Sequence, residues 1–139
     1  MVDRKMPRIH EVIIPVLRSE LASDWPGLTV SSWPANVENR TYPLLNVRRL
    51  GGLPVDVERL DRPVVEVTAY TGVDLPTTEN LLLDARQVLW EMVQKQVTTD
   101  AGHLHSYFET MGPTQFDSRV DDVWRVQMLV QLGLRPRRD

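Results

Sequence analysis

The sequence predicts an α+β protein with a mostly antiparallel sheet of about five strands and two helices on one face. Three observations predict it. One long segment has apolar residues at helical spacing, several short segments alternate apolar and polar residues, and the two kinds of segment do not alternate strictly along the chain. Runs of strands separated by helices are typical of α+β proteins. The expected order is α-β-β-β-α-β-β in one domain of residues 1–139, with loose ends at 1–6 and 135–139.

The central element is a helix predicted over residues 77–97. Its apolar side chains recur every three or four residues and form one stripe along the helix. The stripe consists of Leu81, Leu82, Ala85, Val88, Leu89, Met92 and Val93. Thr77 or Thr78 is expected to cap the start, because Pro76 cannot continue a helix backwards. A one-sided helix needs a partner, and the extended segments before and after it supply a sheet.

The segments before the central helix read in order as one helix and three strands. The helix is predicted over residues 7–21, with a bend at Pro15. The strands are predicted at 28–33, 42–50 and 63–71, and the last is rich in valine. Between the last two strands, residues 51–61 begin with paired glycines and carry mixed charge. This connection is interpreted either as a mobile loop or as the tip of a long hairpin arm.

Two more strands are predicted after the central helix, at residues 103–111 and 123–132, with turn-forming residues at 112–122. Trp124 lies on the apolar face of the last strand, in the pattern of every second residue, and is expected in the core. Both helices should cover one face of the sheet. The other face should meet water or another protein, because it carries four polar side chains: Arg48, Glu66, Arg125 and Gln127.

Composition narrows the class of protein. The 139 residues include 42% hydrophobic and 25% charged residues, which suits a globular domain with its own core. The net charge of −3 disfavours nucleic-acid binding through a broad basic field. Cysteine is absent, which excludes disulfides and thiolate metal sites. Neither a signal peptide nor a membrane-spanning segment is expected.

Motifs for chemistry are sparse, and the sequence predicts no catalytic residue, no metal site and no cofactor. His103 and His105 have a spacing that can hold a metal, but a third ligand is not evident, so exposed strand histidines are the preferred interpretation. Gly51 and Gly52 follow a strand without a helix after them, unlike a phosphate-binding loop. Acidic pairs are interpreted as solvated loop charges because nothing makes them converge: Asp56 with Glu58, Asp121 with Asp122, and Glu109 with Asp117.

Two further features concern binding. Tyr70 and Tyr107 are the candidates for a base-stacking platform, which would need aromatic and basic residues on one sheet face. Arg48 and Arg49 should point to opposite faces of their strand. Because a buried arginine needs a carboxylate partner, Arg49 is expected in a structural ion pair or a subunit contact rather than in a phosphate site.

Several segments in order along the chain resemble the tail terminator proteins of long-tailed phages, particularly those that infect actinobacteria. The matching residues are 7–12, 42–49, 51–52, 63–70, 102–106, 112–116, 124–127 and 132–136. None of these segments is a mechanistic motif, so the resemblance depends on their number and order. Residues 53–60 match least well.

The resemblance implies a structural protein at the head-proximal end of the virion tail, assembled in the host cytoplasm, without catalytic residues or cofactors. It implies a hexameric ring that caps the tail tube, stops its polymerisation and meets head-completion proteins, while DNA passes the lumen without specific binding. A projecting hairpin can join the sheet of a neighbouring subunit. The expected subunit interface comprises Arg48, Arg49, Pro54, Val55, Asp56, Val57, Glu58, Arg59 and Glu66.

Three alternatives stay open from the sequence. The chain is compatible with another neck component, such as a head-closure or tail-completion protein. It is also compatible with a small nucleic-acid-binding module of two helices over a sheet, whose binding would depend on salt. The third alternative is a metal hydrolase that uses His103 and His105 with a carboxylate.

Overall fold

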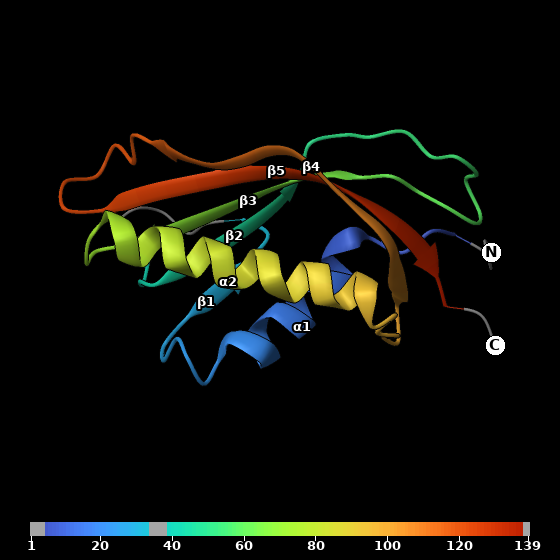
Figure 1. The fold of residues 1–139 in the computed structure, drawn as a ribbon, viewed down its shortest axis with the longest axis horizontal. Coiled ribbons are helices and arrows are strands. Elements are labelled where there is room, and N and C mark those ends of the chain that lie inside the picture. The colour runs from blue at the N-terminus through green and yellow to red at the C-terminus, as the bar shows by residue number, and fades with distance from the viewer. Residues whose placement is uncertain (1–4, 34–38, 138–139) are drawn as a thin grey trace.

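The computed structural model describes residues 5–33 and 39–137. The elements follow the chain as α1 (Ile9–Leu21), β1 (Thr29–Ser31), β2 (Leu44–Arg49), β3 (Val64–Thr71), α2 (Leu75–Gln94), β4 (Gly102–Phe116) and β5 (Trp124–Pro136). This is the predicted order α-β-β-β-α-β-β, and the predicted α+β class is confirmed. Figure 1 shows both helices on the same side of one sheet, as expected.

The sheet has five strands in the order β1-β2-β3-β5-β4. Only β1 and β2 are parallel, and the other three pairs are antiparallel. The register defines two ends of the molecule. At the loop end, Thr71 pairs with Trp124, close to the β4–β5 connection 117–123. At the arm end, Gly102 pairs with Pro136, and the β2–β3 connection 50–63 projects (Figure 1).

The core lies between the two helices and one face of the sheet. Alternate residues of β3, Val65, Val67 and Ala69, are fully buried there, as their period of two requires. The helices contribute their apolar stripes, including Ile13 of α1 and Leu89 of α2, which are also fully buried. α1 continues through Pro15, whose ring is on the exposed side, so one helix is confirmed and the bend stays a prediction.

The start of α2 differs from the prediction. The helix begins at Leu75, and Asp74 rather than a threonine is the capping residue. An Asp74 carboxylate oxygen accepts the backbone N–H of Thr77 at 2.8 Å, and hydrogen bonding from the side chain and the backbone of Thr77 lowers the pKa of Asp74. Pro76 therefore lies in the first turn of the helix. A backbone N–H there has no carbonyl partner within the helix, so proline, which lacks this N–H, costs no hydrogen bond. The helix ends at Gln94, earlier than predicted, and Gln96 has a positive φ of 50°.

The last two strands are longer than predicted. β4 continues to Phe116 through part of the expected turn region, with register shifts between Glu109 and Thr114. Proline is tolerated there because β4 is an edge strand and one of the shifts removes the need for the N–H of Pro113. β5 includes the first residues of the expected loose tail, and Arg135 pairs with His103. Residues 1–4 and 138–139 lie outside the described residues.

The far face of the sheet is less exposed to solvent than expected. Arg48 is exposed there, but Thr68 and Gln127 are buried, and their side chains offset the cost of burial with a hydrogen bond of 3.2 Å to each other. Arg125 extends this contact with a 2.7 Å hydrogen bond to the Gln127 side-chain oxygen. Trp124 was predicted in the core and is only half-buried, because it is the first residue of β5 at the loop end.

We expect the stability of the fold to depend on the buried stripe of α2. Leu89→Ala removes a fully buried side chain and should cost about 2–5 kcal/mol of unfolding free energy. Leu83→Ala on the same helix is the matched control, because Leu83 is 41% exposed and its loss should cost well under about 1 kcal/mol. Urea unfolding followed by circular dichroism measures both. Equal losses would contradict the assignment of the buried face.

Candidate subunit interface

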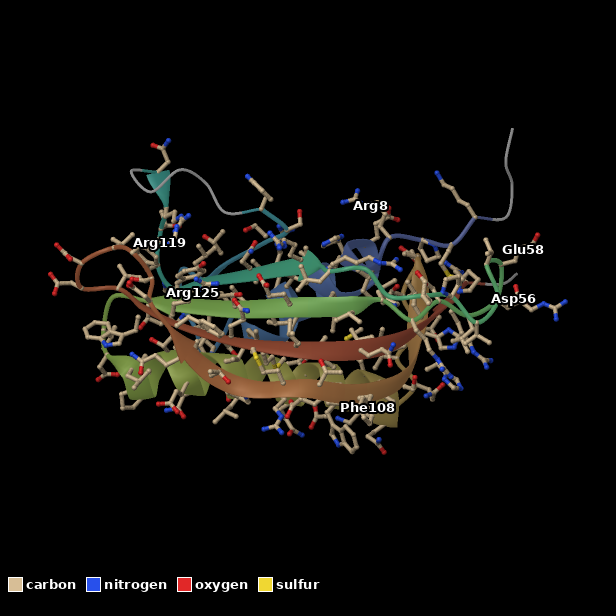
Figure 2. All side chains as sticks on the ribbon, turned by 90° about the horizontal axis from the view of Figure 1, so that it is seen from above. Arg8, Asp56, Glu58, Phe108, Arg119 and Arg125 are labelled. Atoms are coloured by element: carbon tan, nitrogen blue, oxygen red, sulfur yellow. The ribbon has the colours of Figure 1, made fainter. Side chains whose placement is uncertain are left out.

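The β2–β3 connection, residues 50–63, is an ordered hairpin arm rather than a loop without structure. Backbone hydrogen bonds continue the β2–β3 pairing beyond the strands, from the N–H of Leu50 to the carbonyl of Val64 at 2.7 Å. The tip closes as a turn, in which the N–H of Leu60 donates to the carbonyl of Asp56 at 2.9 Å. The Asp56 carboxylate also accepts the N–H of Glu58 at 2.9 Å. Figure 2 shows Asp56 and Glu58 at the outer tip.

An ion pair holds the base of this arm. Two nitrogens of the Arg49 guanidinium donate to the two carboxylate oxygens of Asp61, at 2.7 and 3.2 Å, and a third donates to the carbonyl of Gly51 at 2.8 Å. Asp61 is 94% buried, since its residue exposure is 6%. Of the two alternatives that the sequence predicted for Arg49, a structural ion pair or a subunit contact, the structure shows the ion pair. This bidentate geometry is available to arginine and not to lysine.

The arm is also attached to β5. Asp61 and Leu134 exchange two backbone hydrogen bonds, at 3.0 and 2.8 Å. Gly52 permits the close approach of the two sides of the arm, because its φ of +94° favours glycine and a Cβ there would clash with the backbone of Arg62 and Pro63. The paired glycines thus shape the arm, and β3 rather than a helix follows them, as the sequence indicated.

The outer part of the arm carries apolar side chains into solvent. Leu53 is 81% exposed, Val57 72% and Val55 59%. Placing such side chains on a projecting hairpin leaves apolar surface that is stabilised only when another molecule covers it. The sequence predictions named Val55 and Val57 but missed Leu53, which alternation along the arm would have indicated.

The predicted interface residues fall into two groups. Residues 54–59 lie together on the arm, whereas Arg48 and Glu66 are opposite each other on β2 and β3, on the far face of the sheet. Arg49 belongs to the base of the arm and is occupied by Asp61. The arm is therefore the part of the predicted set that projects from the molecule (Figure 2).

Sequence reasoning also missed a basic pocket beside the arm. The pocket has a volume of about 770 Å³, and its polar lining consists of Arg59, Thr98, His103, Arg135 and Arg137. Burial lowers the pKa of His103, and the nearby charges of Arg135 and His105 lower it further. These residues come from the arm, from the α2–β4 connection, from β4 and from the end of β5 with the residue after it, so their proximity depends on the sheet register, which the sequence does not reveal.

The other candidate sites do not assemble into a chemical centre. Among residues 5–33 and 39–137, no group of three or more histidine, cysteine or acidic side chains is placed to hold a metal ion. Glu109 instead pairs with Arg86 at 2.8 Å, and Asp117 accepts the backbone N–H of Arg119 at 2.9 Å. The loop members of the acidic pairs are exposed, as expected, whereas Glu109 lies on β4, is partly buried and is paired rather than solvated.

The two candidate stacking tyrosines lie on opposite faces of the sheet, so the single-face platform is wrong. Tyr70 is on the far face, where the guanidinium of Arg40 lies 5.6 Å from its ring centre. Tyr107 is on the helix face and meets Trp90 of α2 edge to face, with ring centres 5.6 Å apart. Trp90 is 43% exposed, which places it at the rim of the helix stripe.

The fold and the arm define the class of protein: a small α+β domain with an exposed apolar arm, a kind of surface that is typical of proteins that bind other proteins. The particular family follows from comparison with known proteins. Residues 5–139 match the family described as phage tail termination protein, and the chain belongs to this family. Its members are structural proteins of the phage tail and not enzymes, and the family implies association with the tail tube.

Two relatives come from mycobacteriophages. The gene 22 protein of Mycobacterium phage L5 is 44% identical over 133 residues, which cover 94% of both chains. The gene 22 protein of Mycobacterium phage D29 is 40% identical over 135 residues, which cover 96% of both chains. The resemblance to tail terminators of phages that infect actinobacteria is therefore confirmed. In the part of the chain that the structure describes, no helix is long and apolar enough to cross a membrane.

Breaking the ion pair should loosen the arm. Asp61→Asn keeps the side-chain size but removes the charge that Arg49 contacts, and we expect a loss of about 1–3 kcal/mol with faster amide exchange in residues 51–60. The control is Asp100→Asn, which breaks the exposed contact with Arg137 and should change neither quantity measurably. Hydrogen exchange by mass spectrometry reports both. Unchanged exchange in the arm of the Asp61 variant would refute this role.

Tyr107 should make stability fall in strong alkali. Burial, helped by the charge of Glu109, raises the pKa of the Tyr107 phenol to about 12 from an unfolded value near 10. Between these values the folded state keeps a proton that the unfolded state loses, so stability is complete below pH 10 and falls as the pH rises towards 12. Denaturation at several pH values should show a steeper loss for the wild type than for Tyr107→Phe. Equal slopes would contradict the shift.

Proposed function

We propose that copies of this protein close into a hexameric ring on the finished tail tube, where the ring stops further addition of tube subunits and offers its other side to head-completion proteins. Membership of the tail termination family supports the contact with the tube. The observation that carries the ring is the arm, because it projects apolar side chains from a base that Arg49 and Asp61 hold in place.

The arm suits contact between copies of the chain for a physical reason. A mobile apolar loop would have to lose conformational entropy on binding, whereas this arm is already ordered by its turn and by its attachment to β5. Its apolar surface can therefore stabilise association with little ordering cost. A contact between different surfaces of identical chains forms a ring when its rotation closes.

The lumen of the proposed ring lets DNA pass without specific binding. The net charge of −3 supports this, since grip on a DNA backbone requires clusters of lysine and arginine that neutralise phosphates. The arginines of the basic pocket line one pocket with Leu60 of the arm and Pro136 of β5, rather than being spread across a sheet face.

Leu53→Gln tests the role of the arm, because it places a polar side chain of similar size at the most exposed apolar position on the arm. We expect weaker ring formation and a weaker block of tube growth, with an unchanged unfolding temperature. Leu83→Gln, an exposed leucine on α2, is the matched control and should leave assembly intact. Light scattering, electron microscopy and a polymerisation assay with the tail tube protein provide the measurements.

Two results would count against the proposal. If wild-type protein forms no ring, either alone or on tube ends, the ring is wrong. If it forms a ring but tube growth continues in its presence, the protein acts elsewhere in the neck, for instance in head closure or tail completion.

A further inference from the structure

We propose that successive subunits join end to end, with the basic pocket at the arm end of one copy taking up the acidic β4–β5 connection at the loop end of the next. This inference rests on the proposed ring and specifies which surfaces form its interface. It concerns two regions that lie at opposite ends of the long axis in Figure 1.

The arm end supplies unpaired positive charge. Arg59 and Arg135 are exposed, and within the described residues their side chains make no hydrogen bond or ion pair. Arg137 forms only a weak, exposed ion pair with Asp100 at 3.1 Å. Three guanidinium groups around one pocket repel each other, so a negatively charged partner stabilises the arrangement.

The loop end supplies the opposite charge on an ordered loop. Asp117, Asp121 and Asp122 are exposed in the connection 117–123, where Arg119 is the single basic residue. The Ser118 hydroxyl lies 2.6 Å from the carbonyl oxygen of Val123 and closes the loop. Within residues 39–137, the side chains of Asp121 and Asp122 have no ion-pair or hydrogen-bond partner, so they are available to another chain.

The two ends are also complementary in their apolar surfaces. Beside the basic pocket, the arm projects Leu53 and Val57. Near the acidic connection, a mainly apolar groove of about 330 Å³ is lined by Trp25, Pro26, Pro43 and Val73, among others. Each end therefore has one charged and one apolar component, and each component has its complement at the opposite end of the molecule. This favours a second copy of the chain as the occupant.

The pairing is heterologous, because it joins two different surfaces, and this distinguishes it from a two-fold dimer. Opposite charges at the two ends also prevent wrong contacts, since arm end against arm end places like charges together. The charge thus sets the direction of assembly, and the apolar arm supplies the buried area.

Reciprocal charge reversal tests the pairing. One variant carries Asp121→Lys and Asp122→Lys, and the other carries Arg59→Glu and Arg135→Glu. Either variant alone brings like charges together, and we expect its self-association to weaken at least tenfold, a change of about 1.4 kcal/mol. Mixing the two variants should restore assembly, because each of their unlike ends then meets an opposite charge. Native mass spectrometry should show rings with equal numbers of both variants.

Controls and outcomes separate this inference from the ring itself. Glu20→Lys and Arg8→Glu reverse exposed charges outside the two surfaces and should leave assembly unchanged. Circular dichroism checks that every variant folds. Rings from either reversed variant alone, or mixtures that fail to assemble although the wild type does, would overturn the pairing and leave the proposed ring intact. A wild type that forms no ring, even on tube ends, would instead overturn the proposed function.

Discussion

The ion pair between Arg49 and Asp61 is the interaction on which the shape of the molecule's projecting part depends. It lies where the arm leaves the sheet, and its carboxylate is almost fully buried. A buried carboxylate is costly unless it is paired and hydrogen-bonded, and here the guanidinium and the N–H of Arg62 satisfy it. With its base fixed, the arm holds exposed apolar side chains in one direction. The same side chains on a loose loop would fold back onto the body or present no defined surface.

The two faces of the sheet have different roles in the fold. Its helix face is filled by the apolar stripes of α1 and α2, which supply the buried area that stabilises the fold. Its far face is held by polar contacts, such as the hydrogen bond between Thr68 and Gln127. Because the core requires only one face, the exposed side chains on the arm and at the loop end contribute little to it. Surface chemistry at both ends is therefore independent of the packing that keeps the chain folded.

Much of the fold follows from sequence periodicity, and the interface does so only in part. Helical spacing locates α2, and alternation locates β3, because burial of one face imposes those periods. The start of α2 was misplaced because Asp74 competes with Thr77 for the capping position. The length of β4 was underestimated because an edge strand tolerates Pro113. Arg49 was predicted correctly from its strand face. The basic pocket could not be predicted, since its residues become neighbours only through the pairing of β4 with β5 and the attachment of the arm.

The strand β5 connects the two ends that the proposed ring brings together. It starts at Trp124, directly after the acidic connection, and reaches Pro136 beside the basic pocket. It is hydrogen-bonded on both sides, to β3 and to β4, so its curvature is fixed by the whole sheet. The angle between the two ends is then a property of the folded subunit rather than of the contact. In a ring built from heterologous contacts, the rotation between neighbours decides how many copies close it. A stiff sheet between complementary ends would therefore fix the number of subunits in the proposed ring, as a cap of fixed diameter on a tube requires.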